Sequence, residues 1–599
     1  MTEATAHVPE PDLTLREGMP VSAQFDDVYF SRAGGVAETS HVFLAGNGLP
    51  ERFRDASHFT IGELGFGTGL NFLVTLKAFR ETAAADAMLD YIAVEKYPFR
   101  VETLREILAL QPELATEAAE LLAAYPPRLP GMHHVSFGRV RLTWCFGDVA
   151  ALLPLLDGFA VDAWFLDGFS PAKNPGMWEE KLYGELRRLS KSGTSFATFT
   201  AAGVVKRGLM AAGFAVEKAA GFGHKRDMLR GVMEHQTAPA KKSLPRTAIV
   251  IGGGIAGASV AQALAARGLS VTVLERHQIA SGASGNAAGV LFPQVSKRWN
   301  ASSAWYFTAY GFALRRLQQS QNVTFATPCM LRLPRTIEEE NQLRALQQHF
   351  GLDPAIAHWV ERDAASEIAG VELKNGAAYF PQGSWVSPHS WCHALLQHEK
   401  IILREHAAAI SVQKNARSWL VTLANGETVE AEILCVASAA ESVHLLSNYG
   451  LRLNEVGGQI SEIAAADVAA PLRSILCHKG YVIPAKDRYY IGATYHREDM
   501  LSVTPARHDE NCTELENILP GWRRGEPVGG RSAVRATTPD RLPYVGALED
   551  GLYVSTGHGS RGLLSAPLAA EMIASAVLGE PAPVMPELAR ALDPRRFIR

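Results

Sequence analysis

The stretch TAIVIGGGIAGASVAQALAARGLSVTVLER, residues 247 to 276, decides the fold of the second half of the chain. It predicts a buried strand, a glycine-rich turn, a helix and a second strand, and the turn has the spacing Gly252-x-Gly254-x-x-Gly257. Glu275 ends the second strand 18 positions after Gly257, close to the ~20 residues expected for an acidic side chain that binds a ribose. The pattern predicts a dinucleotide site in an α/β sheet, for a ribose without a 2′-phosphate.

This motif alone does not separate NAD from FAD, because both carry an ADP moiety that binds at a helix N-terminus. Two further stretches favour FAD: ASGASGNAAGVLFPQ, residues 280 to 294, and TGHGSRGLLSAP, residues 556 to 567. Residues 280 to 294 add another loop of small residues after the glycine turn. Residues 556 to 567 add a glycine-rich turn near the C-terminus, which a simple NAD domain does not need. The predicted FAD-binding residues are Gly252, Gly254, Gly257, Glu275, Ser284, Asn286, Gly557, His558, Gly559, Gly562 and Leu563.

Between these stretches the chain is rich in strand-forming residues. SWLVTLANGETVEAEILCVAS, residues 418 to 438, alternates around a turn at Asn425-Gly426, and YYIGATY follows at residues 489 to 495. We expect them to form an antiparallel sheet inserted into the α/β domain, as a candidate substrate lobe.

Upstream, the segment HQTAPAKKSLPRT, residues 235 to 247, shows no periodicity and separates this region from a second α/β pattern over residues 59 to 233. That pattern opens with FTIGELGFGTGLNF, whose Gly65, Gly67 and Gly69 lie between a strand and a helix. A tight connection without a ligand is the alternative.

Acidic residues at the ends of later strands support a nucleoside site. Glu95 ends YIAVEK, where a carboxylate accepts ribose hydroxyl hydrogens, and Asp148 follows RLTWCFG, where it accepts hydrogens from an adenine amino group or simply caps the next helix. The predicted donor-site residues are Glu63, Gly65, Gly67, Gly69, Glu95 and Asp148.

The most specific element of the first half is VDAWFLDGFSPAKNPGMW, residues 161 to 178. It predicts a buried strand that ends at Asp167, followed by a turn stiffened by aromatic and proline residues. Open α/β sheets bind ligands at the carboxyl ends of their strands. We therefore expect the bound ligand to face Asp167 and the acceptor-pocket residues Phe169, Pro171, Lys173 and Asn174.

The set ELGFGTGLNF, VEK, GD and DGFSPAKNP resembles the methyltransferase domain of the bacterial bifunctional tRNA 5-methylaminomethyl-2-thiouridine biosynthesis proteins. Residues 25 to 53 are similar to the N-terminal segment of that family, and GSWVSPHSWCHAL, GGQIS and VRATTPDRLPYVG resemble its oxidoreductase half, which is similar to glycine oxidase and sarcosine oxidase. The resemblance covers most of residues 1 to 235, and residues 247 to the end.

The resemblance implies an N-terminal Rossmann-like class I methyltransferase domain and a C-terminal FAD domain similar to D-amino-acid oxidase, with a Rossmann-type FAD-binding part and an inserted antiparallel substrate lobe. We place the domains at residues 1–235 and 247–599, with a linker at 236–246. The implied cofactors are S-adenosylmethionine, at the donor-site residues named above, and FAD, which we expect to be noncovalent.

The same resemblance implies the chemistry. The FAD domain removes the carboxymethyl group of 5-carboxymethylaminomethyl-2-thiouridine at the wobble position (U34) of tRNA, and the other domain methylates the amine that results. We expect Asp167 to be catalytic and to orient the amine and take its proton, or else only to hold its turn. Arg535 and Arg561 are candidates for binding the substrate carboxylate, or are structural. We assign His558 to flavin contact without proton transfer.

The partner expected from the resemblance is tRNA, bound at its anticodon stem-loop. The net charge of -4 excludes a uniformly basic nucleic-acid-coating protein but permits a local basic patch. Eight basic residues cluster in sequence and either track the RNA or form a solvated surface: Lys206, Arg207, Lys225, Arg226, Arg230, Lys241, Lys242 and Arg246.

Composition bounds the remaining possibilities. With 47% hydrophobic and 20% charged residues, both halves should fold. The six cysteines form no CxxC pair, which predicts reduced thiols and no metal site. The N-terminus lacks a signal-peptide pattern, and charged or glycine residues interrupt the apolar stretches. We expect a cytoplasmic monomer that does not enter membranes. The alternatives are an amine oxidase fused to a methyltransferase that acts on small metabolites, and an RNA-binding scaffold without activity.

Overall fold

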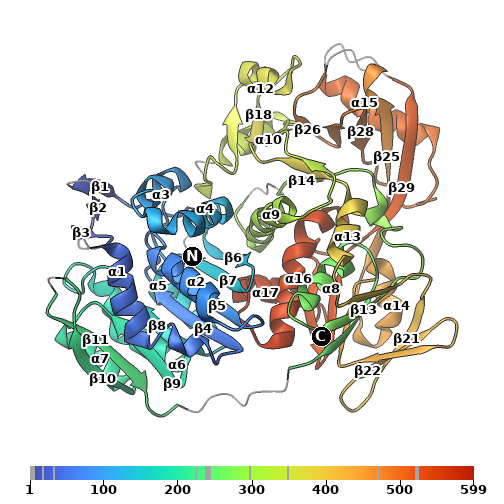
Figure 1. Cartoon of the computed structure of the whole chain (residues 1–599). Coiled ribbons are helices and arrows are strands. Elements are labelled where there is room, and N and C mark those ends of the chain that lie inside the picture. Colours follow the sequence, from blue (N-terminus) through green and yellow to red (C-terminus); the bar gives the residue numbers. More distant parts are fainter. Residues whose placement is uncertain are drawn as a thin grey trace. The chain divides into compact units, whose positions relative to one another are not determined.

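The computed structural model describes residues 7–16, 19–30, 34–223, 225–236, 244–293, 295, 298–346, 350–467, 471–519 and 525–598. The chain forms two compact units (Figure 1). The first comprises residues 7 to 243 with 579 to 586, and the second comprises 244 to 578 with 587 to 599. Most of the predicted linker lies outside the described residues, so the domain limits stay a prediction.

An eight-stranded sheet, with the order β10-β11-β9-β8-β4-β5-β7-β6, forms the centre of the first unit. Its five parallel strands are β4 (His58–Leu64), β5 (Met88–Glu95), β7 (Val140–Phe146), β8 (Val161–Leu166) and β9 (Ser190–Thr198). Antiparallel strands complete both edges: β6 (Gly131–Phe137), β10 (Phe214–Ala220) and β11 (Asp227–Met233). A three-stranded sheet precedes them: β1 (Leu13–Arg16), β2 (Met19–Ser22) and β3 (Asp27–Val28).

The helices of this unit are α1 (Gly35–Thr39), α2 (Leu70–Thr82), α3 (Val101–Leu108), α4 (Ala115–Ala124), α5 (Val149–Leu152), α6 (Glu180–Arg188) and α7 (Gly203–Ala211). The middle strands are apolar along almost their whole length because parallel strands are covered on both faces. In β8, Phe165 joins one core cluster while Trp164 and Leu166 join another. Since neighbouring side chains of a strand point to opposite faces, the two clusters fill the two sides of the sheet.

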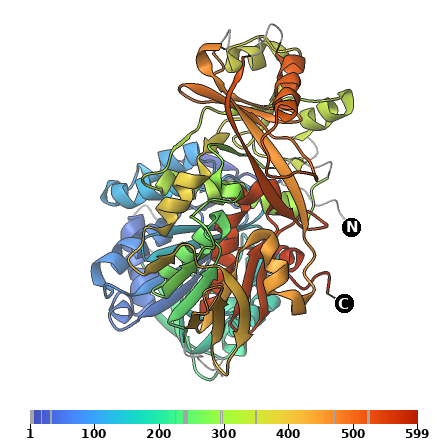
Figure 2. The ribbon, with the colours of Figure 1, turned by 90° about the vertical axis from the view of Figure 1, so that its right-hand side faces the viewer.

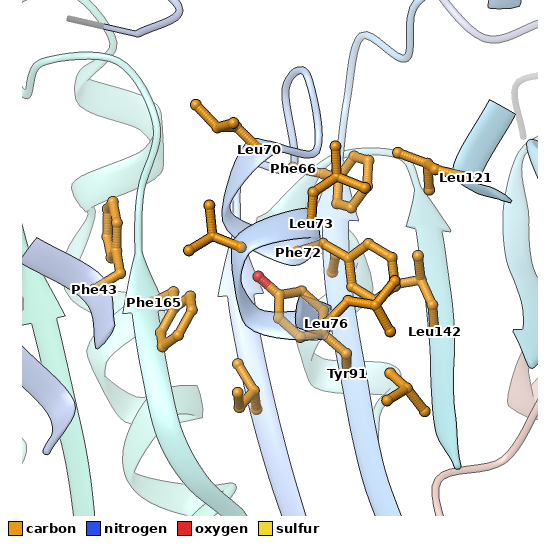
Figure 3. Close-up of a cluster of buried hydrophobic side chains, with 14 of the residues drawn as sticks. Phe43, Phe66, Leu70, Phe72, Leu73, Leu76, Tyr91, Leu121, Leu142 and Phe165 are labelled. Atoms are coloured by element: carbon orange, nitrogen blue, oxygen red, sulfur yellow. The ribbon is translucent and has the colours of Figure 1, made fainter. Parts of the chain in front are cut away.

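The first of these clusters contains helix α2 and is drawn in Figure 3. Phe72 from α2 lies edge-on to Tyr91 of β5, with 5.2 Å between ring centroids, and is fully buried. Such a phenylalanine stabilises a core by about 3–5 kcal/mol relative to alanine. This packing fixes α2 on the sheet and so fixes the glycine turn that precedes it.

In the second unit, a six-stranded sheet has the order β20-β13-β12-β24-β31-β30. Its parallel strands are β12 (Thr247–Ile251), β13 (Ser270–Leu274), β20 (Ile401–Arg404), β24 (Ile433–Val436) and β31 (Leu552–Thr556), and β30 (Tyr544–Glu549) is antiparallel. Helices α8 (Ile255–Ala265) and α16 (Gly562–Leu578) pack on this sheet, while α9 (Ala301–Gln319) packs against α16 and α13 (Pro388–Leu396) packs against α8.

An eight-stranded sheet of this unit, which we name the substrate lobe, contains one parallel strand pair. In sheet order its strands are β17 (His358–Val360), β18 (Ala377–Phe380), β16 (Met330–Arg332), β26 (Ile475–Cys477), β27 (Tyr481–Pro484), β28 (Arg488–Gly492), β25 (Asn454–Ala464) and β29 (Pro527–Thr537). Figure 2 shows the long orange strands β25 and β29 extending into this lobe.

Two small sheets complete the unit: β14 (Gly289–Leu291), β19 (Ser384–Val386) and β15 (Phe325–Ala326), and then β21 (Ala409–Lys414), β22 (Trp419–Leu423) and β23 (Thr428–Ala431). Further helices within the described residues are α10 (Ile337–Arg344), α12 (Arg362–Ala369), α14 (Ser442–Leu445), α15 (Pro505–Ile518) and α17 (Pro586–Leu592).

The predicted antiparallel sheet exists, but its expected composition was wrong in part. YYIG lies in β28 of the substrate lobe, whereas the hairpin β22–β23, with its turn at Asn425-Gly426, belongs to a separate three-stranded sheet. The continuation ILCV is β24 of the parallel sheet, where it is fully buried. A short run of apolar residues does not reveal which sheet it joins, because the hydrophobic pattern indicates burial and does not indicate which strand pairs with it.

One helix of the described chain, Gly559–Leu578, is long and apolar enough to cross a membrane by length and composition alone. It packs against α8 and α9 within the second unit, and 61% of its apolar window is buried there. A helix buried to this extent inside its own unit has the environment of a core helix.

Candidate active sites

The glycine turn after β4 takes a backbone shape that other residues rarely adopt. Gly65, Gly67 and Gly69 have positive φ angles of 88°, 52° and 77°. A Cβ atom on Gly65 would lie 3.1 Å from the Cα atom of Gly168, so the turn passes close to the end of β8. The N–H groups of Gly65 and Phe66 both donate to the Val94 carbonyl oxygen, which holds the turn against the end of β5.

Glu95 lies next to this turn, at the end of β5. Its carboxylate accepts hydrogen bonds from the backbone N–H groups of Gly67 and Tyr97, both at 2.7 Å. Burial raises the pKa of Glu95, and the backbone hydrogen bonds oppose that shift. A hydrogen-bond acceptor is thereby fixed beside the glycine turn, and its role in ribose binding stays a prediction.

Asp148 both caps a helix and borders the cavity described next. It accepts a hydrogen bond from the Ala150 N–H at 2.9 Å, and it forms an ion pair with Lys96 at 2.9 Å. The helix-capping alternative is thus the observed arrangement.

A cavity of about 1130 Å³ opens at the carboxyl ends of the strands. Of the predicted residues, its walls include Gly65, Gly67, Glu95, Asp148, Asp167, Phe169 and Asn174. Glu63 is fully buried behind the wall, and Gly69, Pro171 and Lys173 lie outside it. The volume of the cavity, the glycine turn and the acidic residue at the strand end fit S-adenosylmethionine. A cavity of this volume is large enough for a ligand of that size.

Asp167 stands at the end of β8 and faces the cavity. Its Oδ1 atom accepts from the Gly168 N–H at 2.8 Å, and its Oδ2 atom accepts from Asn71 Nδ2 at 2.8 Å. Burial raises the pKa of Asp167 from 3.8 to about 6, against these hydrogen bonds. A carboxylate with this pKa is charged at neutral pH and able to take a proton.

Aromatic rings form the wall beside Asp167. Phe169 stacks on Phe25 with 4.7 Å between centroids and meets Tyr29 edge-on at 5.3 Å. Asp27 accepts from the Ser170 N–H at 3.0 Å, which ties the N-terminal segment to the turn. The Lys173 Nζ atom lies 3.8 Å from Asp27 Oδ1. Lys173 does not line the cavity, although the sequence predicted it in the acceptor pocket.

The basic residues predicted as an RNA track do not act alike. Lys225 pairs with Glu38 at 3.1 Å and lies over the Phe199 ring on the cavity wall. Arg230 pairs with Glu217 at 2.5 Å across β10 and β11. Lys206 and Arg207 lie on α7, and Arg226 borders the cavity. Lys241 and Lys242 lie outside the described residues.

The second glycine turn, after β12, repeats the design of the first. Glu275 accepts from the Gly253 N–H at 2.7 Å and from the His277 N–H at 2.9 Å. A Cβ atom on Gly257 would come within 1.8 Å of the Gly252 oxygen, so only glycine lets α8 pack this close to β12. The Ile255 N–H donates to Ser284 Oγ at 3.0 Å.

A cavity of about 1330 Å³ runs along this turn. Of the predicted FAD-binding residues, Gly257 alone is absent from its walls. The cavity fits an extended dinucleotide, because residues 251 to 290 and 555 to 564 border the same space.

The loop with Ser284 and Asn286 is held by an arginine that the sequence did not reveal. Arg531, on β29, donates to Asn286 Oδ1 at 2.9 Å. It also donates to the carbonyl oxygens of Ser281 and Gly282, both at 2.6 Å. The Arg531 guanidinium group thus links strand β29 of the substrate lobe to the loop at residues 281 to 286.

His558 is fixed by two serines. Its Nε2 atom lies 3.0 Å from Ser555 Oγ and its Nδ1 atom 2.7 Å from Ser565 Oγ. Burial lowers its pKa from 6.5 to about 4, so the ring is neutral near pH 7. A neutral, doubly hydrogen-bonded ring matches a supporting role on the cavity wall.

Arg535 and Arg561 border the same cavity, as predicted for groups near a flavin. The Arg535 guanidinium lies 4.7 Å from the centre of the Tyr495 ring, and that of Arg561 lies 5.0 Å from the Tyr306 ring. Gly458 makes room for Arg535, since a Cβ atom there would lie 2.0 Å from Arg535 Nη2.

Known proteins share both halves of this architecture. A family model described as FAD dependent oxidoreductase matches residues 247–576, and one described as S-adenosyl-L-methionine-dependent methyltransferase matches residues 112–234. A protein of Chromobacterium violaceum is 40% identical over 98% of this chain and 97% of its own length. One of Methylobacillus flagellatus is 41% identical over 98% and 96%. Both are named tRNA 5-methylaminomethyl-2-thiouridine biosynthesis bifunctional protein MnmC.

The chain belongs to the MnmC family. This confirms the predicted family and fold class, an α/β methyltransferase domain followed by a D-amino-acid-oxidase-like FAD domain. The MnmC domains use S-adenosylmethionine and FAD, as predicted. This chain is also similar in fold to L-amino acid deaminase from Proteus myxofaciens, with a TM-score of 0.51 at 16% identity over 64% of this chain and 98% of that one.

Proposed function

We propose that this bifunctional enzyme converts 5-carboxymethylaminomethyl-2-thiouridine at U34 of tRNA to the 5-methylaminomethyl product in two steps. The FAD domain first releases the primary amine, and the methyltransferase domain then methylates it. The relatives named for this biosynthesis support the substrate class. The observation that carries the proposal is the presence of Arg535 and Arg561 on the cavity that holds the FAD glycine turn.

In the first step, these two guanidinium groups bind the carboxylate of the carboxymethyl group, which orients the carbon between carboxylate and nitrogen. FAD, when bound, supplies the two-electron oxidation of that carbon–nitrogen bond. Water then adds to the C=N bond of the oxidised substrate, and the bond breaks to give the primary amine and glyoxylate. His558 stays neutral throughout and supports the cavity wall.

In the second step, Asp167 takes one proton from the ammonium form of the amine. The nitrogen lone pair then forms the new N–C bond while the C–S bond of the sulfonium donor breaks. Phe169, with the stacked Phe25, covers the acceptor side and keeps water away from the reacting atoms. Alignment of donor and acceptor supplies much of the acceleration.

The anticodon stem-loop is the part of the tRNA that we propose as the binding determinant, because U34 lies within it. Noncovalent FAD, a monomeric enzyme and a cytoplasmic location complete the proposal. An enzyme that acts on small amines is the alternative, and free glycine or sarcosine would then be oxidised.

The test uses purified, FAD-loaded protein and tRNA that carries the carboxymethylaminomethyl uridine. After incubation with or without S-adenosylmethionine, digestion and mass spectrometry identify the nucleosides. We expect aminomethyl-uridine without the donor and methylaminomethyl-uridine with it. An unchanged tRNA together with oxidation of sarcosine would favour the metabolite enzyme.

A further inference from the structure

One amide in the methyltransferase unit joins two carboxyl groups. Asn71, in the first turn of α2, donates from Nδ2 to Glu63 Oε1 and to Asp167 Oδ2, each at 2.8 Å. Its Oδ1 atom accepts from the Thr39 hydroxyl at 2.8 Å. Every polar atom of this side chain is therefore used, and its orientation is fixed, because an amide turned the other way would present an oxygen to both carboxyl groups.

The two carboxyl groups differ in their access to substrate. Glu63 is completely buried and lies behind the cavity wall, while Asp167 borders the cavity. Asn71 stands between them and is itself buried at 6% exposure. A proton from a bound amine has a direct route only to Asp167.

Charge is confined to one of the two groups. Two carboxylates that share one buried donor repel each other, so one of them keeps its proton. Burial, followed by the charge of Asp167, raises the pKa of Glu63 well above its ordinary range. Among the described residues, the other titratable and charged groups that act on this pair are Tyr91, Glu95, Glu38 and Lys225. Glu63 is thus the neutral member, and Asp167 carries the charge.

We propose that Asn71 is a positioning residue for methyl transfer, which fixes the orientation of the Asp167 carboxylate at the cavity wall and, with a protonated Glu63 behind it, keeps the single negative charge of the pair on Asp167. This inference rests on the proposed function of the methyltransferase site. Asp167 receives one proton from the ammonium group, and it later loses that proton to water. Asn71 and Glu63 neither gain nor lose a proton.

The experiment measures methyl transfer to tRNA that already carries aminomethyl-uridine, as a function of pH. Asn71→Leu has nearly the same shape but removes both donors. We expect a fall in kcat of about tenfold, the usual loss for one hydrogen bond to a charged group. The acid limb of the pH profile should move to higher pH, because the carboxylate has lost a stabilising donor. Because Asn71 also borders the cavity, kcat is compared at saturating S-adenosylmethionine and the dissociation constant of the donor is measured separately.

Two further variants keep the inference falsifiable if Asn71→Leu fails to fold. Thr39→Val leaves Asn71 in place but frees its amide to rotate, so it should show the same upward shift in a milder form. Glu63→Gln keeps the acceptor oxygen and cannot ionise, so it should lose far less activity than Asp167→Asn. Oxidation of the carboxymethyl substrate by the same chain is the internal control for folding and concentration.

The outcomes are distinct. An unshifted acid limb in both Asn71→Leu and Thr39→Val would overturn the positioning role. Weaker S-adenosylmethionine binding at unchanged kcat would make Asn71 a donor-binding residue instead, and equal losses in Glu63→Gln and Asp167→Asn would show that the charge is not confined to Asp167. If the wild-type enzyme does not methylate the tRNA at all, the proposed function fails rather than this inference.

Discussion

Glu95 and Glu275 occupy equivalent positions in the two sheets of this chain. Glu95 is the last residue of β5 and Glu275 directly follows β13. Each accepts hydrogen bonds from an N–H group of the preceding glycine turn and from the N–H two residues further on. The N–H donors of the turns lie at 2.7 Å in both cases. The same backbone arrangement thus occurs at both of the predicted ribose sites.

Removing either carboxylate should disable one reaction and spare the other. We expect Glu95→Ala to weaken S-adenosylmethionine binding by about tenfold or more, through loss of a charged acceptor. Glu275→Ala should release FAD in the same manner. Calorimetry with the methyl donor and the flavin absorbance of the purified protein measure the two effects. If each variant affects both ligands equally, the equivalence has no functional meaning.

Methyl transfer should depend on the ionisation of Asp167. Its pKa is raised to about 6, chiefly by burial. Below that pH the carboxyl is protonated and takes no proton, so kcat for the preformed amine should fall as the pH drops through about 6. Asp167→Asn should lower kcat by about 100-fold and remove this limb. A variant that retains the limb would assign it to another group.

The sequence predicted those parts of the sites that are local in the chain. Both glycine turns and their acidic partners follow from spacings of a few tens of residues, and the comparisons confirm the fold class and the cofactors. Asn71 was missed, although a polar residue within the apolar run LNFLVTL was the available signal. Its role depends on β8, whose Asp167 lies 96 residues away.

Arg531 had no sequence signal at all. It lies 245 residues from Asn286, and its partners are mainly carbonyl oxygens, which every residue type offers. The positions of Pro171 and Lys173 were equally unpredictable, because a turn motif fixes the backbone but not the side of it that faces a cavity. Tertiary packing decides such questions.

Arg535 and Arg531 lie on the same strand and should have separable roles. Arg535→Lys replaces a two-pronged contact with a single point charge, so KM for the carboxymethyl tRNA should rise by about tenfold. Arg531→Lys should instead reduce FAD retention, because its fork holds the loop at Ser281 and Asn286. Steady-state kinetics and flavin content separate the two. A KM effect from Arg531→Lys at full flavin content would contradict this assignment.

Gly62 should tolerate no larger residue. A Cβ atom there would lie 2.3 Å from the buried Trp164 ring, so Gly62→Ala should destabilise the first unit by about 1–3 kcal/mol. Gly184 is the matched control, since it is exposed in α6 and nothing lies within 4 Å of its Cβ position. Gly184→Ala should be neutral or stabilise by up to about 1 kcal/mol. Thermal unfolding of both variants measures this, and equal melting temperatures would exclude the steric argument.

His558 should make the second unit less stable in acid. Its pKa is lowered from 6.5 to about 4 by burial, so between these values the unfolded chain binds a proton that the folded chain does not. Stability is complete above pH 6.5 and falls as the pH drops toward 4, by roughly 3 kcal/mol. His558→Asn removes the titrating ring, so the difference in unfolding free energy between wild type and variant should change across this range and stay constant above it. Denaturant unfolding at pH 7.5, 6 and 5 tests this, and a difference that does not vary with pH would show that the ring is protonated in the folded state or free to reach water.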